Sequence, residues 1–218
     1  MQLKFLITLL FASINLSFSQ NRKETKTIAN SDSKVIIDTP ENGKIENGYY
    51  ICNKFDWKIT VLEGYKITSI ERVRELENKG HQLMKEASNV TINPHPTHLI
   101  GFELDKYNYF SASFESLQGK KNFTFEEHKK FVEQLFKDSY SMVKELKFEI
   151  VTSDMKIGKY NFYKIHIKLF SAKTSTLLLT QELYNSYIDN NLFSASINYT
   201  NQNVGNALNN NFIKSLEQ

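Results

Sequence analysis

Stretches in which apolar and polar residues alternate recur along this 218-residue chain, and they are typical of β-strands with one buried face. The clearest stretch, residues 162–169, puts Tyr163, Ile165, Ile167 and Leu169 on one face and Phe162, Lys164, His166 and Lys168 on the other. Similar runs predict strands at 34–38, 48–53, 57–61, 98–104, 109–114, 148–152, 176–187 and 192–199. Turn residues that tolerate positive φ lie between runs, at 41–44, 46–48 and 157–159. Strands joined by such short turns pair antiparallel.

Three other segments repeat apolar residues every three or four positions, which predicts amphipathic helices. They cover residues 68–87, 124–146 and 203 onward. Thr68 with Glu71, and Thr124 with Glu127, can form capping boxes at the first two helix starts. Since amphipathic helices must cover a sheet face, we expect an α+β fold, a mostly antiparallel β-sheet flanked by amphipathic helices in an α/β/α sandwich.

The N-terminus has the three parts of a secretory signal peptide. Lys4 supplies a positive charge, an apolar run follows to Leu16, and small residues precede Gln20. We therefore expect residues 1–19 to be a signal peptide cleaved after Ser19, and the mature protein to be secreted or periplasmic. The Asn-, Lys- and Ile-rich composition suggests a bacterial source. Residues 20–33 are polar and predict a flexible leader, and 34–218 predict a single α+β domain.

The charge pattern indicates no nucleic-acid partner. The formal net charge is +3, and lysines alternate with acidic residues along most of the chain instead of clustering. No later segment has the length and apolarity of a membrane span, so we expect no membrane insertion after signal cleavage. The sequence leaves the oligomeric state open.

Cys52 is the only cysteine, so the chain cannot form an intramolecular disulfide. It lies in the apolar run 49–52, without a histidine or basic cluster that would activate it. We expect a buried, unreactive thiol. A reactive or intermolecular thiol is the alternative.

Histidines offer the one candidate metal site. His95 and His98 lie in the segment Pro94-His95-Pro96-Thr97-His98, with His81 nearby in sequence, and could bind a metal ion. The spacing is not that of a helical pair, and no cysteine or tight carboxylate cluster completes a ligand set. The competing interpretation is a proline-stiffened loop with exposed imidazoles. We expect His166 on the wet face of its strand and His128 in a structural role.

Catalytic and cofactor motifs are missing from the sequence. It has no G-x-S-x-G elbow, Walker loop or G-x-G-x-x-G loop, and we predict no catalytic residue and no cofactor. The neighbouring carboxylates Glu126 and Glu127 are read as capping and solvated charges. The aromatic cluster at 107–110 is read as core and rim, with a stacking platform as the alternative.

The order of elements resembles the PsbP-like family, which includes PsbP, the Mog proteins and exported bacterial proteins of unassigned role. Residues 57–65, Trp-Lys-Ile-Thr-Val-Leu-Glu-Gly-Tyr, resemble an early strand of that family that enters an aromatic-closed turn, although Leu62 stands where the family commonly has proline. Residues 110–114 resemble its small-residue strand before the long helix. The resemblance implies an accessory or docking protein.

These observations lead to one functional expectation and two alternatives. We expect an exported, non-catalytic binding or accessory domain that uses a sheet edge or helix face to contact a protein or envelope component. The first alternative is a metal-assisted hydrolase that uses His95 and His98. The second is an exported toxin-like or immunity-like factor.

Overall fold

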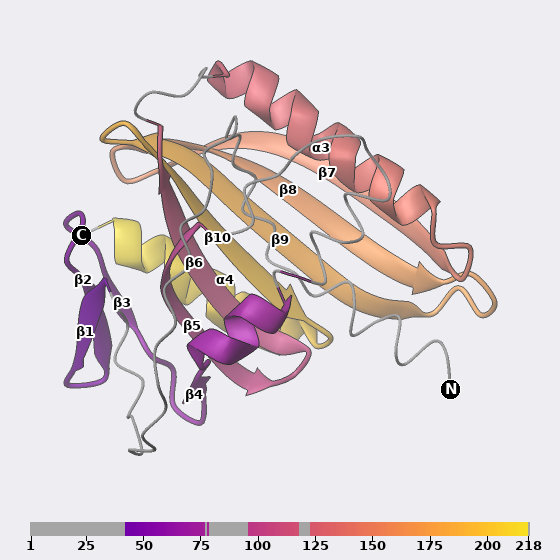
Figure 1. Ribbon diagram of the computed structural model, residues 1–218. Coiled ribbons are helices and arrows are strands. Elements are labelled where there is room, and N and C mark those ends of the chain that lie inside the picture. The colour runs from indigo at the N-terminus through magenta and orange to yellow at the C-terminus, as the bar shows by residue number, and fades with distance from the viewer. Residues whose placement is uncertain (1–41, 77, 79–95, 118–122, 218) are drawn as a thin grey trace, which may run out of the picture.

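The alternating runs form a large antiparallel sheet. The computed structural model describes residues 42–76, 78, 96–117 and 123–217. Its seven-stranded sheet has the order β4-β5-β6-β10-β9-β8-β7, drawn in Figure 1. The strands are β4 (Lys66–Ile67), β5 (Thr97–Asp105), β6 (Asn108–Ser116), β7 (Leu146–Ile157), β8 (Tyr160–Ser171), β9 (Leu177–Ile188) and β10 (Asn191–Tyr199). Neighbouring strands pair antiparallel throughout, as predicted.

A second, smaller sheet precedes it in the chain. It contains β1 (Gly43–Glu46), β2 (Tyr49–Cys52) and β3 (Lys58–Thr60). The turn between β1 and β2 is where it was predicted, since Asn47 and Gly48 both have positive φ. The predicted turn at 41–44 is wrong from Gly43 onward, because pairing with β2 extends Gly43 and Lys44 into a strand.

The capping box predicted at Thr124 is confirmed, whereas the one predicted at Thr68 is wrong. The first helix starts at residue 70, the Ser69 hydroxyl accepts from the Arg72 backbone N–H, and Thr68 Oγ1 has no hydrogen-bond partner among the described residues. The long helix α3 (Phe125–Ser141) begins with the complete Thr124–Glu127 capping box. The C-terminal helix α4 (Gln202–Leu216) begins at Asn201, whose side chain accepts a hydrogen bond from the Asn203 backbone. Residues 70–76 are helical, and the rest of the first predicted helix lies largely outside the described residues.

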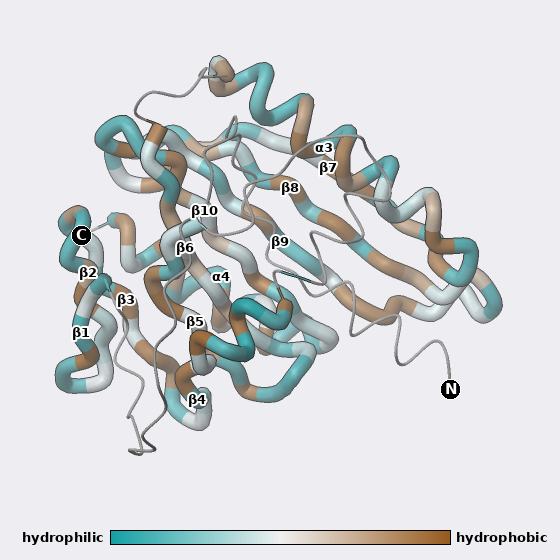
Figure 2. Tube along the Cα trace, viewed as in Figure 1, coloured by the Kyte–Doolittle hydropathy of each residue, from teal (hydrophilic) through white to brown (hydrophobic). Residues whose placement is uncertain are grey.

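The two faces of the large sheet carry separate apolar cores, which confirms the α/β/α sandwich. Phe162 on β8 packs in the core under α4, whereas its neighbour Tyr163 packs in the core under α3. The first core also receives Ile59 of β3 and Trp57, which directly precedes that strand. Figure 1 shows α3 and α4 on opposite sides of the sheet, and Figure 2 shows apolar and polar residues following one another along its strands.

Several sequence predictions fall outside the described residues. They are the signal peptide (1–19), the polar leader (20–33), the strand at 34–38, and the histidines His81 and His95. Within the described parts of the chain, no helix is both long and apolar enough to cross a membrane.

Candidate functional site

Part of the large sheet is left open on the side of α4. That helix packs against β10, β6 and β3. On this side of β7, the last residue, Ile157, lies in the core, whereas the residues toward the start of the strand, from Ser153 back to Lys147, are exposed to solvent. We define the open face as Lys147, Glu149, Val151 and Ser153 of β7 with Lys164, His166 and Lys168 of β8.

The open face is mixed in charge and has an apolar centre. In the strand register Glu149 lies opposite Lys168, Val151 opposite His166, and Ser153 opposite Lys164. Val151 is 61% exposed, the most exposed large apolar side chain among the residues that the structure describes. Val151 therefore gives this otherwise polar face one exposed apolar side chain.

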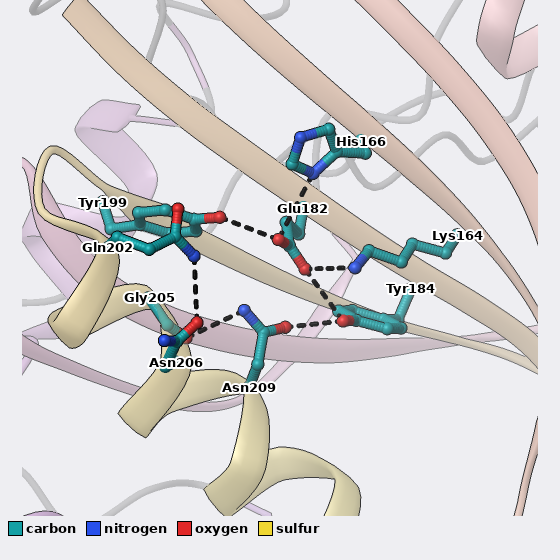
Figure 3. A network of polar contacts seen from close by, with 9 residues as sticks. All are labelled: Lys164, His166, Glu182, Tyr184, Tyr199, Gln202, Gly205, Asn206 and Asn209. Carbon is teal, nitrogen blue, oxygen red and sulfur yellow. Dashed lines mark hydrogen bonds and ion pairs between the residues drawn. The ribbon is translucent and has the colours of Figure 1, made fainter.

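A buried carboxylate lies at the margin of the open face. Glu182 on β9 is 5% exposed, and four side chains surround it, as drawn in Figure 3. The Lys164 ammonium lies 2.6 Å from Oε2, and His166 Nδ1 lies 3.3 Å from Oε1. The hydroxyls of Tyr184 and Tyr199 donate to the same carboxylate, each over 2.9 Å.

These contacts keep Glu182 ionised. Burial by itself would raise the pKa of Glu182, but hydrogen bonds from His166 and Lys164, together with the charge of Lys164, outweigh burial and lower that pKa to about 2. Burial, with the adjacent Glu182, raises the pKa of both Tyr184 and Tyr199. Both tyrosines therefore stay protonated and can donate hydrogen bonds.

The same network fastens α4 to the sheet. The Tyr184 hydroxyl lies 2.5 Å from Asn209 Oδ1, and Asn209 Nδ2 donates to the Gly205 carbonyl over 2.8 Å. A single cluster therefore joins β8, β9, β10 and α4. The cluster is a buried, hydrogen-bonded carboxylate that connects these elements at the edge of the open face.

Proton transfer near neutral pH does not suit this cluster. A general base works best with a pKa near the operating pH, and the pKa of Glu182 is far below it. His166 is oriented by a carboxylate, as a hydrolase base would be, and its second ring nitrogen points away from Glu182 (Figure 3). However, its cross-strand neighbour Val151 offers no nucleophile.

The histidine pair proposed for a metal is only half described. His98 lies on β5, and burial lowers its pKa to about 4, which keeps the ring neutral. His95 lies outside the described residues. Across the ranges that the structure describes, no group of three or more His, Cys, Asp or Glu side chains is arranged to hold a metal ion.

Other sequence predictions can be located directly. His128 is buried on α3, and its Nδ1 lies 2.7 Å from the Tyr163 hydroxyl, in a structural role. Cys52 is a free buried thiol, as predicted. In the aromatic cluster, Tyr109 and Phe110 pack into the two opposite cores, which confirms the core interpretation for these two rings.

Sequence reasoning missed Glu182 as the centre of a network. The strand at 176–187 was predicted, but no motif distinguishes this carboxylate from a solvated one. The available signal was its position within a largely apolar strand, where a charge needs partners if it is buried. His166 was expected on a wet face; it is partly exposed and also contacts Glu182.

Comparison with known proteins identifies a similar arrangement and no close relative. No protein-family model matches the chain, and no curated protein matches it. The solution structure of cyanobacterial PsbP (CyanoP) from Synechocystis sp. PCC 6803 matches with a TM-score of 0.49 and 8% sequence identity, over 86% of this chain and 94% of that chain. That protein carries the PsbP name of the family that the sequence resembles; the likeness assigns no partner or activity to this chain.

Proposed function

We propose that this chain is an exported, non-catalytic binding or accessory domain that contacts a protein partner through β7 and the open face. The observation that carries the proposal is the position of β7. This strand has 12 residues, lies at the end of the sheet order, and pairs on one side with β8. Among the described strands, nothing pairs with its other side.

An edge of this length can accept an added strand. The unpaired backbone N–H and C=O groups of an edge strand are a template for an extended segment of another protein. The opposite end of the large sheet is the two-residue strand β4, which offers far less backbone. The edge of β7 is therefore the stronger candidate for strand addition.

The side chains of the open face indicate what the partner segment should carry. Val151 offers an exposed apolar contact, and Lys147, Lys164 and Lys168 lie on the same face. Glu182 forms an ion pair with Lys164, whereas Lys147 and Lys168 form no ion pair among the described residues, although Glu149 lies opposite Lys168 in the register. We expect an extended segment with an apolar residue and a nearby acidic one.

The test compares two arginine variants at exposed apolar positions. The full chain, tagged at its C-terminus and expressed in its own host, is purified from envelope and culture-fluid fractions, and co-purifying proteins are identified by mass spectrometry. Val151→Arg places a charge in the proposed contact. Leu104→Arg, at 46% exposure on β5, is the matched control away from β7.

A stoichiometric partner that is retained by the wild type and by Leu104→Arg, and lost from Val151→Arg, supports the proposal. Retention of nothing at any salt concentration overturns it. Equal retention by Val151→Arg also overturns it, because the contact would then lie elsewhere. Since Val151 is exposed, the arginine variant should fold with stability within about 0.5 kcal/mol of the wild type.

A further inference from the structure

Two central strands carry the same tetrapeptide. Phe-Ser-Ala-Ser occurs at 110–113 in β6 and again at 193–196 in β10. The antiparallel register places Ser194 opposite Ser113 and Ser196 opposite Ser111, with the two alanines opposite each other between them. The phenylalanines and alanines of both copies pack in the core under α4. The four serines therefore lie together on the other face, which is the face of α3.

We define these four serines as the serine patch, and it is buried. Ser113 is 1% exposed, and Ser111, Ser194 and Ser196 are 8% exposed or less. With strands about 4.8 Å apart and alternate residues about 7 Å apart along a strand, the four hydroxyls outline a small rectangle. A buried sheet face at this position would ordinarily carry large apolar side chains, as it does on the opposite side.

One end of the patch is closed by hydrogen bonds. Asn198 Nδ2 donates to Ser196 Oγ over 3.0 Å, and Gln181 Nε2 donates to Asn198 Oδ1 over 2.7 Å. The Tyr140 hydroxyl of α3 then donates to Gln181 Oε1. This chain shows how the fold satisfies buried polar groups on this face when no ligand is involved.

The other end of the patch is not closed in this way. Ser194 donates to Asn185 Oδ1 over 2.7 Å, but neither Asn185 Nδ2 nor Ser113 Oγ has a hydrogen-bond partner among the described residues. Asn185 is 5% exposed, so both groups are cut off from bulk water. Exchanging the amide oxygen and nitrogen of Asn185 would still leave one end of the amide unpaired.

A third unpaired group lies beyond β5, in the register row of Ser111. Thr68 Oγ1 is buried without a partner and lies 3.1 Å from the position that a Cβ on Gly101 would occupy. Gly101 faces Ser111 in the register, and His98 faces Ser113. Buried polar groups in folded proteins are nearly always hydrogen-bonded, so Ser113 and Asn185, which lie on either side of Ser194 in one row of the register, indicate a missing partner.

We propose that the end of the serine patch formed by Ser113 and Asn185 binds a small neutral molecule rich in hydroxyl groups, of the monosaccharide class. Each ligand hydroxyl both donates and accepts, which matches a serine hydroxyl and either end of an amide. The surrounding groups are hydroxyls, amides, the neutral ring of His98 and the buried carboxyl group of Glu115, which lies two residues from Ser113 on the same face of β6. An anionic ligand would find no positive charge among these groups to offset its burial.

The test uses isothermal titration of the full chain with glucose and N-acetylglucosamine, and with glucuronate as the charged analogue. We expect at least one neutral sugar to bind, and glucuronate to bind at least tenfold more weakly. Ser113→Ala and Asn185→Leu should each reduce the affinity at least tenfold. Ser186→Ala is the matched control. Ser186 is as buried as Ser113, follows Asn185 on β9, and donates its hydroxyl to the Asn161 carbonyl on the other face of the sheet.

Thermal unfolding separates binding from a structural role. Ser113→Ala removes a hydroxyl that has no partner, so its melting temperature should equal or exceed that of the wild type while sugar affinity falls. Failure of both neutral sugars to bind overturns the proposal, as does unchanged affinity in Ser113→Ala. Crystals soaked in glucose that show isolated water molecules alone at Ser113 Oγ would overturn it as well.

Discussion

Gly205 on α4 lies directly against the ring of Tyr199 on β10. A Cβ added to Gly205 would lie 2.5 Å from Tyr199 Cε2 and 2.6 Å from Cζ, closer than non-bonded carbon atoms approach. Because the Tyr199 hydroxyl donates to Glu182, the ring cannot move aside without disturbing that buried carboxylate. The close approach of helix and sheet thus depends on the missing side chain.

We therefore expect Gly205→Ala to destabilise the fold by about 1–3 kcal/mol, the usual cost of overpacking. The sign is informative, because alanine normally stabilises a helix interior relative to glycine by roughly 0.5–1 kcal/mol. Urea unfolding followed by the fluorescence of Trp57, the only tryptophan and 2% exposed, measures the change. Asn210→Ala, at an exposed position of α4, is the control and should be neutral or stabilising. A stabilised Gly205→Ala would contradict the packing argument.

Acid should weaken the protein through Glu182. Its pKa is lowered from 4.5 to about 2 in the folded protein, so it contributes stability that is fully present above about pH 5 and is lost as the pH falls toward 2. A difference of this size corresponds to roughly 3 kcal/mol as an upper estimate. The free energy of unfolding of Glu182→Gln should therefore fall less between pH 6 and pH 3 than that of the wild type.

The control for this experiment is Glu149→Gln on β7, which is separated from β9 by β8. Glu149 is exposed on β7, so its removal should leave the pH dependence close to that of the wild type. If Glu182→Gln and the wild type lost stability in parallel over the same pH range, another carboxylate would be responsible for the acid sensitivity.

Much of the architecture could be predicted because it rests on local patterns. The alternation in 162–169 correctly separates Phe162 from Tyr163, and these two side chains enter the two different cores. The capping box at Thr124 correctly marks the start of α3. Positive-φ residues at Asn47 and Gly48 mark a hairpin in the same way.

Features that depend on which strands become neighbours could not be predicted. β6 pairs with β10, which is more than 70 residues further along the chain, and no local pattern encodes that choice. Glu182 acquires Lys164 from β8 and Tyr199 from β10 through the same long-range pairing. The repeated Phe-Ser-Ala-Ser is visible in the sequence, but its serines form a patch only once the register is known.

The start of α3 provides a simple stability test. Thr124 Oγ1 accepts from the Glu127 backbone N–H over 3.2 Å, and Glu127 Oε2 accepts from the Thr124 backbone N–H over 2.8 Å. Thr124→Ala removes the capping oxygen and should lower the free energy of unfolding by about 1 kcal/mol. Thr124→Ser keeps the oxygen and should cost less than half as much. Equal losses in the two variants would mean that the methyl group of Thr124, and not its hydroxyl, stabilises the helix start.

The metal hypothesis can be tested with the two histidines that motivated it. We expect His95→Ala with His98→Ala to leave the metal content of the purified chain unchanged, measured by inductively coupled plasma mass spectrometry. Burial lowers the pKa of His98 to about 4, so its ring is neutral and has a nitrogen lone pair that could bind a metal ion. However, the described residues contain no group of three ligands arranged around a metal site. Added Zn²⁺ should accordingly raise the melting temperature of neither the wild type nor the double variant. A melting temperature that rises with Zn²⁺ in the wild type alone would show that His95 and His98 bind metal, and would favour the metal-assisted hydrolase over the binding domain.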